Sequence, residues 1–504
     1  MSLLGIDVGT TGCKAARFSE TGQLLKASYR EYDSRRVQPG WAELDTLEVW
    51  ERIVETIAEA VSAGRQDPVK ALAVSSLGEA VVPVSRDRRP LGPSLLNFDA
   101  RGSEYLLGLR ARVDDVRWYA INGNTPGNHY SLTKLLWLKE HQPSLYSLTH
   151  KFLHWSGFVS YMLGADPAVD YSLANRTLLF DLENRDWSDE LLEAAGLDRD
   201  KLPTTVASGV VIGHLAPQIA RDLALPAGIP IVSGGHDQCC NGVGCGVVEP
   251  GQALFGMGTY LCMMPVYCHR PESSAMIQRG LNTEHHAVPG QLVSFIYNQG
   301  GALVKWFRDT FAAVEREQAR SRRENVYDSL LAEMPQGPSR LMVLPHFTAT
   351  GPPRFISDSA GVIAGLKLET SRGEILKAIL EGSTFYLRES LEALPPTGIE
   401  ISGFRAAGGG SQSDTWVQTC ADILNRPFTR PKVSEAGTLG AAILAGCGSG
   451  LWPTLQDGVE AMVLIDRVFS PDPVASRAYD QHFDVYKRLW PLLSDYLRDL
   501  AALG

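Results

Sequence analysis

A short glycine turn occurs twice in this chain, once near the N-terminus and once near the middle. The first copy is Asp7-Val8-Gly9-Thr10-Thr11 and the second is Gly256-Met257-Gly258-Thr259-Tyr260. Gly9 and Gly258 lie 249 positions apart in a chain of 504 residues, so the spacing is nearly half the length. Strand-like sequence flanks each turn. We therefore interpret the chain as a duplicated α/β unit.

Apolar periodicity predicts similar elements in the two halves. We expect strands at 3–6, 14–18, 24–32, 69–77, 229–233, 340–344 and 401–407, and helices at 45–64, 301–309, 371–393 and 476–501. The duplication places a first domain at 1–247 and a second at 248–504. The last helix, 476–501, has room to pack back on the first domain.

Charge and hydropathy exclude two classes of partner. The net charge is -10 and no long run of Lys or Arg occurs, so we expect no nucleic-acid partner. No window approaches the ~18 apolar residues of a membrane-spanning helix, and the N-terminal sequence lacks a signal-peptide pattern. We therefore expect a cytoplasmic protein that does not enter a membrane.

Glycine turns after strands let backbone N–H groups approach an anion closely. In the first turn, Thr10 and Thr11 add hydroxyl groups, Lys14 adds a cation, and Asp7 can hold hydrated Mg²⁺. In the second turn, Gly258 and Thr259 offer the same combination of amide and hydroxyl. Either turn alone is also compatible with an ordinary β-hairpin.

A third glycine loop follows the strand expected at 401–407. It contains Gly408, Gly409, Gly410 and Ser413, and helical sequence begins directly after it. A strand, a glycine loop and a helix N-terminus together make a favourable nucleotide site, although a connector that binds nothing is the alternative. The GxGxxG and GxxxxGK[ST] nucleotide motifs do not occur at the first strand.

Asp237 is the best candidate for a general base. It follows the buried strand at 229–233 within Gly234-Gly235-His236-Asp237-Gln238, where a carboxylate would meet a crevice at the carboxyl edge of a sheet. The alternative role for Asp237 is to cap the following helix. His236 is better interpreted as a neighbour of the base than as the base itself.

These motifs, in this order, resemble those of the FGGY carbohydrate kinases of the actin-like ATPase superfamily. The resembling segments are 5–11 (first phosphate loop), 40–43 (sugar side), 235–238 (base), 256–259 (second phosphate loop), and 404–411, 422–427 and 435–442 (C-terminal signature). The resemblance implies two ribonuclease-H-like domains around a deep cleft. ATP would contact mainly the second domain and the sugar mainly the first, with Asp7 and Asp237 near Mg²⁺.

The resemblance also suggests where the sugar binds. The candidate substrate residues are Gly78, Glu79, Asn97, Asp99, Arg101, Asp237 and Gln238. Carboxylate and amide groups suit a polyol because each can bridge neighbouring hydroxyl groups. The alternative is that the loop of Asn97, Asp99 and Arg101 is a salt-bridged structural loop.

The substrate class remains open at this stage. Residues 97–101 and 133–137 resemble xylulokinase-like members, whereas residues 131–138 and 169–174 resemble gluconate-kinase-like members. Gly78-Glu79-Ala80 departs from the histidine that xylulokinase-like members tend to carry there. We expect an ATP- and Mg²⁺-dependent kinase for a ketose, either a pentulose such as xylulose or a hexulose, with gluconate or another polyol as the alternative.

Two functions of another class remain alternatives. One is a non-catalytic actin-like ATPase and the other is a sugar-binding regulator without turnover. A regulator would be expected to have lost part of the phosphate loops or the base, yet Asp7, Thr10, Gly258 and Asp237 are all present. By analogy with the family, a homodimer is also an expectation.

Overall fold

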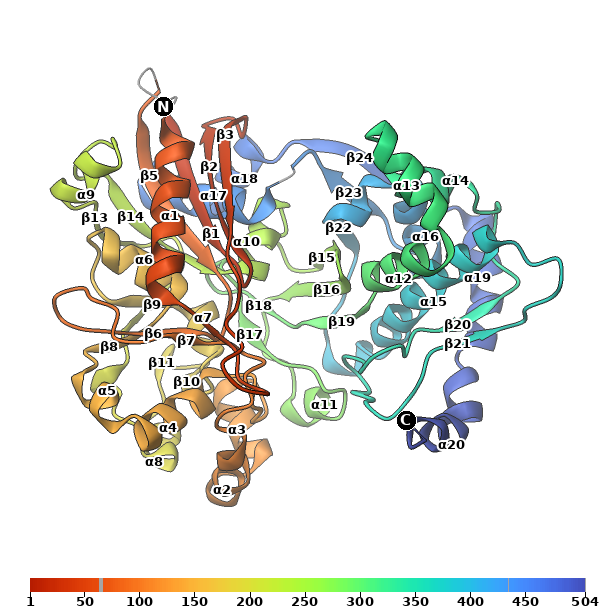
Figure 1. Ribbon diagram of the computed structural model, residues 1–504, viewed down its shortest axis with the longest axis horizontal. Helices are drawn as coiled ribbons and strands as arrows, with labels where there is room; N and C mark the ends of the chain where they lie inside the picture. Colours follow the sequence, from red (N-terminus) through yellow and green to blue (C-terminus); the bar gives the residue numbers. More distant parts are fainter. Residues whose placement is uncertain (63–66, 434, 504) are drawn as a thin grey trace.

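Two open β-sheets side by side organise the protein (Figure 1). The computed structural model describes residues 1–62, 67–433 and 435–503. The first sheet has the order β13-β14-β5-β1-β2-β3. Its strands are β1 (Ser2–Val8), β2 (Gly12–Ser19), β3 (Leu24–Glu31), β5 (Val69–Ser76), β13 (Val211–His214) and β14 (Pro230–His236).

The second sheet has the order β17-β18-β16-β15-β22-β23-β24, and β19 also pairs with β16. Its strands are β15 (Gln252–Met257), β16 (Tyr260–Tyr267), β17 (Glu284–His285), β18 (Leu292–Val293), β19 (Ile296–Gln299), β22 (Gly403–Ala407), β23 (Phe428–Pro431) and β24 (Ile465–Phe469). The strand expected at 340–344 forms β20 (Met342–Leu344), which pairs with β21 (Val362–Ala364) outside this sheet.

The two sheets repeat one pairing scheme. In the first, β1 runs antiparallel to β2 and parallel to β5, while β14 runs parallel to β5 and antiparallel to β13. In the second, β15, β16, β22, β23 and β24 repeat these relations, except that the antiparallel edge strand β24 follows β23 in the chain, whereas β13 precedes β14. The predicted duplication and the α/β fold class are therefore confirmed, and the two glycine turns occupy equivalent positions between β1 and β2 and between β15 and β16.

The helices of the first half surround its sheet and an additional layer below it (Figure 1). They are α1 (Thr46–Val61), α2 (Leu106–Arg112), α3 (Asp115–Asn122), α4 (Ser131–His141), α5 (Pro143–Leu148), α6 (Trp155–Leu163), α7 (Tyr171–Asn175), α8 (Asp189–Ala195), α9 (Pro217–Asp222) and α10 (Asp237–Gly244). Short strands join them: β4 (Glu43–Leu44), β6 (Val81–Val84), β7 (Ser94–Leu95), β8 (Lys151–His154), β9 (Ala168–Asp170), β10 (Phe180–Asp181), β11 (Asp186–Trp187) and β12 (Thr204–Val206).

Helix α1 forms as its sequence predicts. The Asp45 side chain accepts hydrogen bonds from the backbone N–H groups of Leu47 and Glu48, which caps the helix N-terminus. Ile53 and Ile57, one helical turn apart, are fully buried against the first sheet. The helix end predicted at Gly64 lies outside the described residues.

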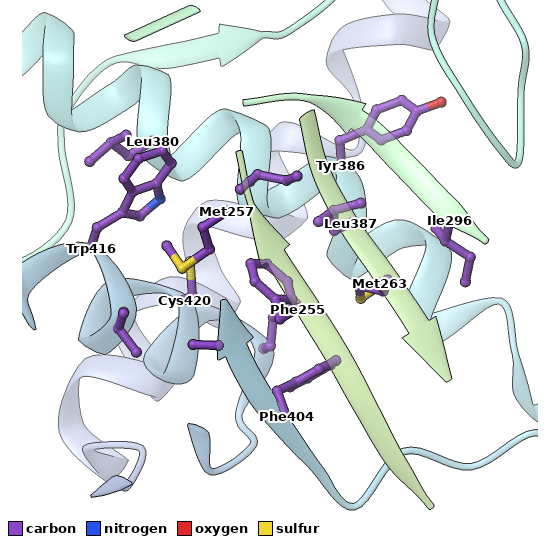
Figure 2. Close-up of a cluster of buried hydrophobic side chains, with 14 of the residues drawn as sticks. Phe255, Met257, Met263, Ile296, Leu380, Tyr386, Leu387, Phe404, Trp416 and Cys420 are labelled. Carbon is purple, nitrogen blue, oxygen red and sulfur yellow. The ribbon is translucent and has the colours of Figure 1, made fainter. Parts of the chain in front are cut away.

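The second half contains the remaining helices. They are α11 (Ser273–Ile277), α12 (Gly301–Phe311), α13 (Ala313–Arg322), α14 (Val326–Ala332), α15 (Arg372–Glu392), α16 (Asp414–Leu424), α17 (Ala436–Gly448), α18 (Leu455–Met462), α19 (Pro473–Tyr486) and α20 (Leu489–Ala501). Helix α15 begins with a complete capping box formed by Ser371 and Glu374. Phe255 and Phe404 on the second sheet share an apolar core with Leu380 of α15 and Trp416 of α16 (Figure 2).

One helix crosses from the second half to the first. Alternate residues of β1 face opposite sides of the sheet: Leu4 packs with α1, whereas Leu3 packs with Leu439 and Ala442 of α17. A Cβ on Gly5 would lie 1.8 Å from the carbonyl oxygen of Thr438, so the backbones of β1 and α17 touch. Helix α17 therefore covers the face of the first sheet opposite α1.

The described residues of the terminal segment pack on the second half. It forms two helices, α19 and α20, and Tyr479 and Phe483 of α19 pack against Phe385 of α15. Arg388 of α15 also forms an ion pair with Asp480. Helix α19 thus packs on helices of the second half, whereas α17 and α18 pack on the first sheet.

Substitution of Gly440 tests the contact between α10 and α17. A Cβ at this position would lie 1.9 Å from the carbonyl oxygen of Cys240 in α10, so Gly440→Ala must push the helices apart. We expect the free energy of unfolding to fall by about 2–3 kcal/mol. The measurement is thermal unfolding followed by circular dichroism.

Gly108 in α2 supplies a matched control. It is also a helical glycine, but no described atom lies within 4 Å of an added Cβ. We expect Gly108→Ala to leave stability unchanged or to raise it by up to about 1 kcal/mol. Equal stability of the two variants would contradict the close approach of the helices.

Candidate active site

A cavity of about 1090 Å³ lies between the two halves and takes its wall from both. Most of the residues that we predicted for the site meet here. They are Thr10, Gly78, Glu79, Asn97, Asp237, Gln238, Gly258, Thr259 and Gly408. The structure therefore brings the predicted base, part of the predicted sugar site and all three glycine loops to one place.

Asp237 is the first residue of α10, directly after β14. Burial raises the pKa of Asp237, and the nearby carboxylates of Asp7 and Glu79 raise it further, to about 7. An aspartate with a pKa near neutrality is a stronger proton acceptor than an ordinary carboxylate. The position and the pKa of Asp237 therefore suit the general base that we predicted.

His236 supports the base rather than replacing it. Its Nε2 lies 3.2 Å from Oδ1 of Asp237. Burial lowers the pKa of His236 well below its ordinary value, and the positive charge of Arg176 lowers it further. The backbone N–H of His236 donates to Oγ of Ser172 at 2.9 Å, and Ser172 donates in turn to Asp170, which fixes the end of β14.

The glycine loops lie close to one another at the cavity. The N–H of Gly9 donates to the carbonyl oxygen of Gly12 at 2.9 Å, and the N–H of Gly258 donates to that of Tyr260 at 3.1 Å. Gly408 has φ +90°, and an added Cβ there would lie 3.0 Å from the carbonyl carbon of Met257. Only glycine fits this approach, which brings the third loop against the second.

Several predicted phosphate or nucleotide contacts lie outside the cavity wall. Lys14 forms an ion pair with Glu435 at 2.8 Å, and the side chain of Ser413 caps α16. Thr11 is exposed beyond the first turn. Thr11, Lys14, Gly409, Gly410 and Ser413 do not line the cavity. Their contact with ATP stays a prediction.

Asp99 and Arg101, which we predicted to contact the sugar, form a buried ion-pair cluster with Glu43. Both side chains are buried away from the cavity, and Nη2 of Arg101 lies 2.6 Å from Asp99 and 2.9 Å from Glu43. The guanidinium also stacks on Trp41, 4.1 Å from the ring centroid. A carboxylate and a guanidinium two residues apart satisfy each other once buried, so of this loop Asn97 alone reaches the cavity wall.

The predicted Mg²⁺ ligands, Asp7 and Asp237, have a suitable environment. Asp7 is partly buried, its Oδ1 accepts a hydrogen bond from Ser75 at 2.8 Å, and its charge raises the pKa of Asp237. A cation would relieve the repulsion between the two carboxylates. Among the described residues, no group of three or more His, Cys, Asp or Glu side chains is arranged so that it could hold a metal ion. Two carboxylates are sufficient for Mg²⁺, which keeps water and phosphate ligands.

Two protein-family models cover most of the chain. The N-terminal domain of the FGGY family of carbohydrate kinases matches residues 2–244, and the C-terminal domain of the same family matches residues 257–449. The chain belongs to the FGGY family of carbohydrate kinases. It is therefore a phosphotransferase with an alcohol group as acceptor, as the sequence resemblance implied.

Individual FGGY proteins match over nearly their full length. A xylulose kinase of Staphylococcus epidermidis is 26% identical, over 99% of each chain. An autoinducer-2 kinase of Salmonella choleraesuis is 28% identical, over 95% of this chain and 92% of the other. The crystal structure of xylulose kinase from Rhodospirillum rubrum has a TM-score of 0.87 at 25% identity and covers 99% of this chain and 100% of the other.

The structure adds residues to this FGGY site that the sequence had not indicated. They are Asn124, His129, Tyr130, Arg176, Asn282, Phe295 and Tyr297, all in the cavity wall. Arg176 forms ion pairs with Glu79 and, at 2.8 Å, with Glu284. These partners are 97 and 108 residues away along the chain, so no local pattern could have revealed them.

Within the described residues, no helix is both long and apolar enough to cross a bilayer.

The raised pKa of Asp237 predicts how kinase activity depends on pH. A general base must be deprotonated, so kcat/KM should fall about tenfold per unit as the pH drops below about 7, and should level off above it. The measurement is the initial rate of ADP release at limiting acceptor. A rate independent of pH between about 5.5 and 7 would contradict this role of Asp237.

Proposed function

We propose that the protein is an ATP- and Mg²⁺-dependent kinase that phosphorylates a terminal hydroxyl of a ketose, a pentulose such as xylulose. The observation that carries the proposal is the position of Asp237. It lies in a cavity wall that has polar acceptor-binding candidates, Glu79 and Asn97, and glycine turns at Thr10 and Gly258. The names of the xylulose kinases among its relatives support the same class of acceptor.

In the proposed mechanism, Asp237 accepts the proton of the acceptor hydroxyl. The oxygen then attacks the γ-phosphorus of ATP in line, the bond to the bridging oxygen breaks, and ADP leaves. The N–H groups of the two glycine turns, with Thr10 and Thr259, would hold the phosphates, and Gly408 would face the nucleotide. Mg²⁺ held near Asp7 and Asp237 would neutralise phosphate charge.

The alternative functions differ in whether they require a base. A hexulose, gluconate or another polyol as acceptor would use the same base and the same phosphate site. A non-catalytic ATPase or a sugar-binding regulator would not need a base with a pKa near 7 in the acceptor cavity. The proposal includes a cytoplasmic location, a homodimer and no nucleic-acid partner, which rest on the family resemblance and on the net charge of -10.

Replacement of the base is the direct test of the mechanism. We expect Asp237→Asn to lower kcat by a factor of about 10³ or more, because the amide keeps the shape but takes no proton. Nucleotide binding, measured by calorimetry, should change little. Asp495→Asn, the same substitution at an exposed carboxylate, is the control. A fully active Asp237→Asn enzyme would remove Asp237 from the role of base.

An acceptor screen tests the substrate. ADP release is measured with pentuloses, hexuloses, polyols and aldonates at equal concentrations, and we expect the largest kcat/KM for a pentulose. A large signal for another acceptor would replace the pentulose in the proposal. Silence with every acceptor, together with intact ATP binding, would favour the regulator.

A further inference from the structure

Arg176 is the only arginine or lysine among the described residues that line the cavity. An anionic acceptor would therefore depend on Arg176 for electrostatic stabilisation.

This guanidinium is already engaged on both sides. One terminal nitrogen, Nη2, donates to Glu79, and the other, Nη1, donates to Glu284 at 2.8 Å. Burial disfavours the charged form, but the carboxylates of Glu284 and Glu79 outweigh it and raise the pKa of Arg176 well above its ordinary value. The rings of Tyr130 and Phe295 lie 5.4 and 5.7 Å from the guanidinium carbon. Arg176 is thus both charged and held in place.

Glu284 belongs to β17 of the second half, although Arg176 belongs to the first. The carboxylate accepts a second hydrogen bond, from Asn282 at 2.6 Å, and its side chain is 1% exposed. Its neighbour His285 donates its backbone N–H to Asn175 of α7 at 3.0 Å. The backbone of β17 is therefore fixed against the first half, and Glu284 cannot leave Arg176 without breaking these contacts.

The charges of the cluster do not cancel. Two carboxylates, Glu79 in the cavity wall and Glu284 behind it, flank one guanidinium, so negative charge is in excess. An acceptor carboxylate entering this site would meet an arginine whose charge two carboxylates already outweigh, although its Nε–H has no partner among the described residues. A neutral polyol meets no such penalty, because hydroxyl groups can bond to carboxylates and amides alike.

We propose that Glu79 and Glu284 make the acceptor site selective for neutral sugars because their two charges outweigh that of Arg176, and so exclude aldonates. This inference rests on the proposed kinase function and goes further by assigning the discrimination to a named ion-pair cluster. Glu284, contributed by the second half, is the specificity-determining residue that no sequence motif indicated. The class admitted is an uncharged ketose or polyol.

The test replaces each carboxylate with its neutral isostere. Glu284→Gln and Glu79→Gln keep the shape of the side chain but leave Arg176 with one ionic partner. For each variant, kcat/KM is measured with gluconate and with xylulose. We expect the ratio of gluconate to xylulose to rise about tenfold in both variants, because the guanidinium gains a carboxylate partner from the acceptor.

The matched control is Glu333→Gln. Glu333 is also one of two glutamates that flank an arginine, Arg372, but this cluster lies outside the cavity. Its substitution should leave the acceptor ratio unchanged. Thermal unfolding of each variant shows whether it is folded, and two independent glutamate variants keep the test decisive if one of them is unstable.

Binding without ATP separates this inference from the proposed function. The dissociation constant of gluconate is measured by calorimetry for the wild type and both variants, and we expect it to fall about tenfold when either glutamate is neutralised. If the wild type phosphorylates no ketose, the proposed function fails while this measurement still tests the charge selectivity. An unchanged ratio and unchanged gluconate binding in both variants, or a wild type that prefers gluconate, would overturn the inference.

Discussion

The backbone contact between α10 and α17 determines the geometry of the whole cleft. A Cβ on Gly244 of α10 would lie 2.0 Å from the carbonyl oxygen of Ala436, so the helices cross at the closest distance that backbones allow. Asp237 is the first residue of α10 and Ala436 the first of α17, and both line the cavity. The crossing therefore fixes the base against the second half, and both helix N-termini point their N–H groups toward a region suited to phosphate.

The sequence was sufficient for the features that depend on local pattern or on the repeat. The strands, the paired glycine turns, the capped helix α1 and Asp237 at the end of β14 follow from apolar period, turn chemistry and a spacing of 249 residues. The packing of α17 on the first sheet could not be predicted from the sequence. This helix has apolar residues on all sides, so its sequence does not indicate which sheet it covers.

Ion pairs between distant residues mark the other limit of sequence reasoning. Asp99 and Arg101 looked suited to a sugar because charged and amide groups bind polyols, yet they satisfy each other and are buried with Glu43. Arg176 has a similar arrangement of two carboxylates but lines the cavity. The Arg176 cluster lies at the cavity and the Arg101 cluster does not. This difference depends on how the two halves pack together.

The crossing of α17 also bears on the order in which the chain can fold during synthesis. One face of β1 packs with Leu439 and Ala442, more than 430 residues later in the chain. Until residues 436–448 have emerged from the ribosome, α17 cannot cover that face of the N-terminal sheet. The nascent first half therefore exposes apolar surface during synthesis. The two halves are repeats in architecture, but they complete their folding as one unit.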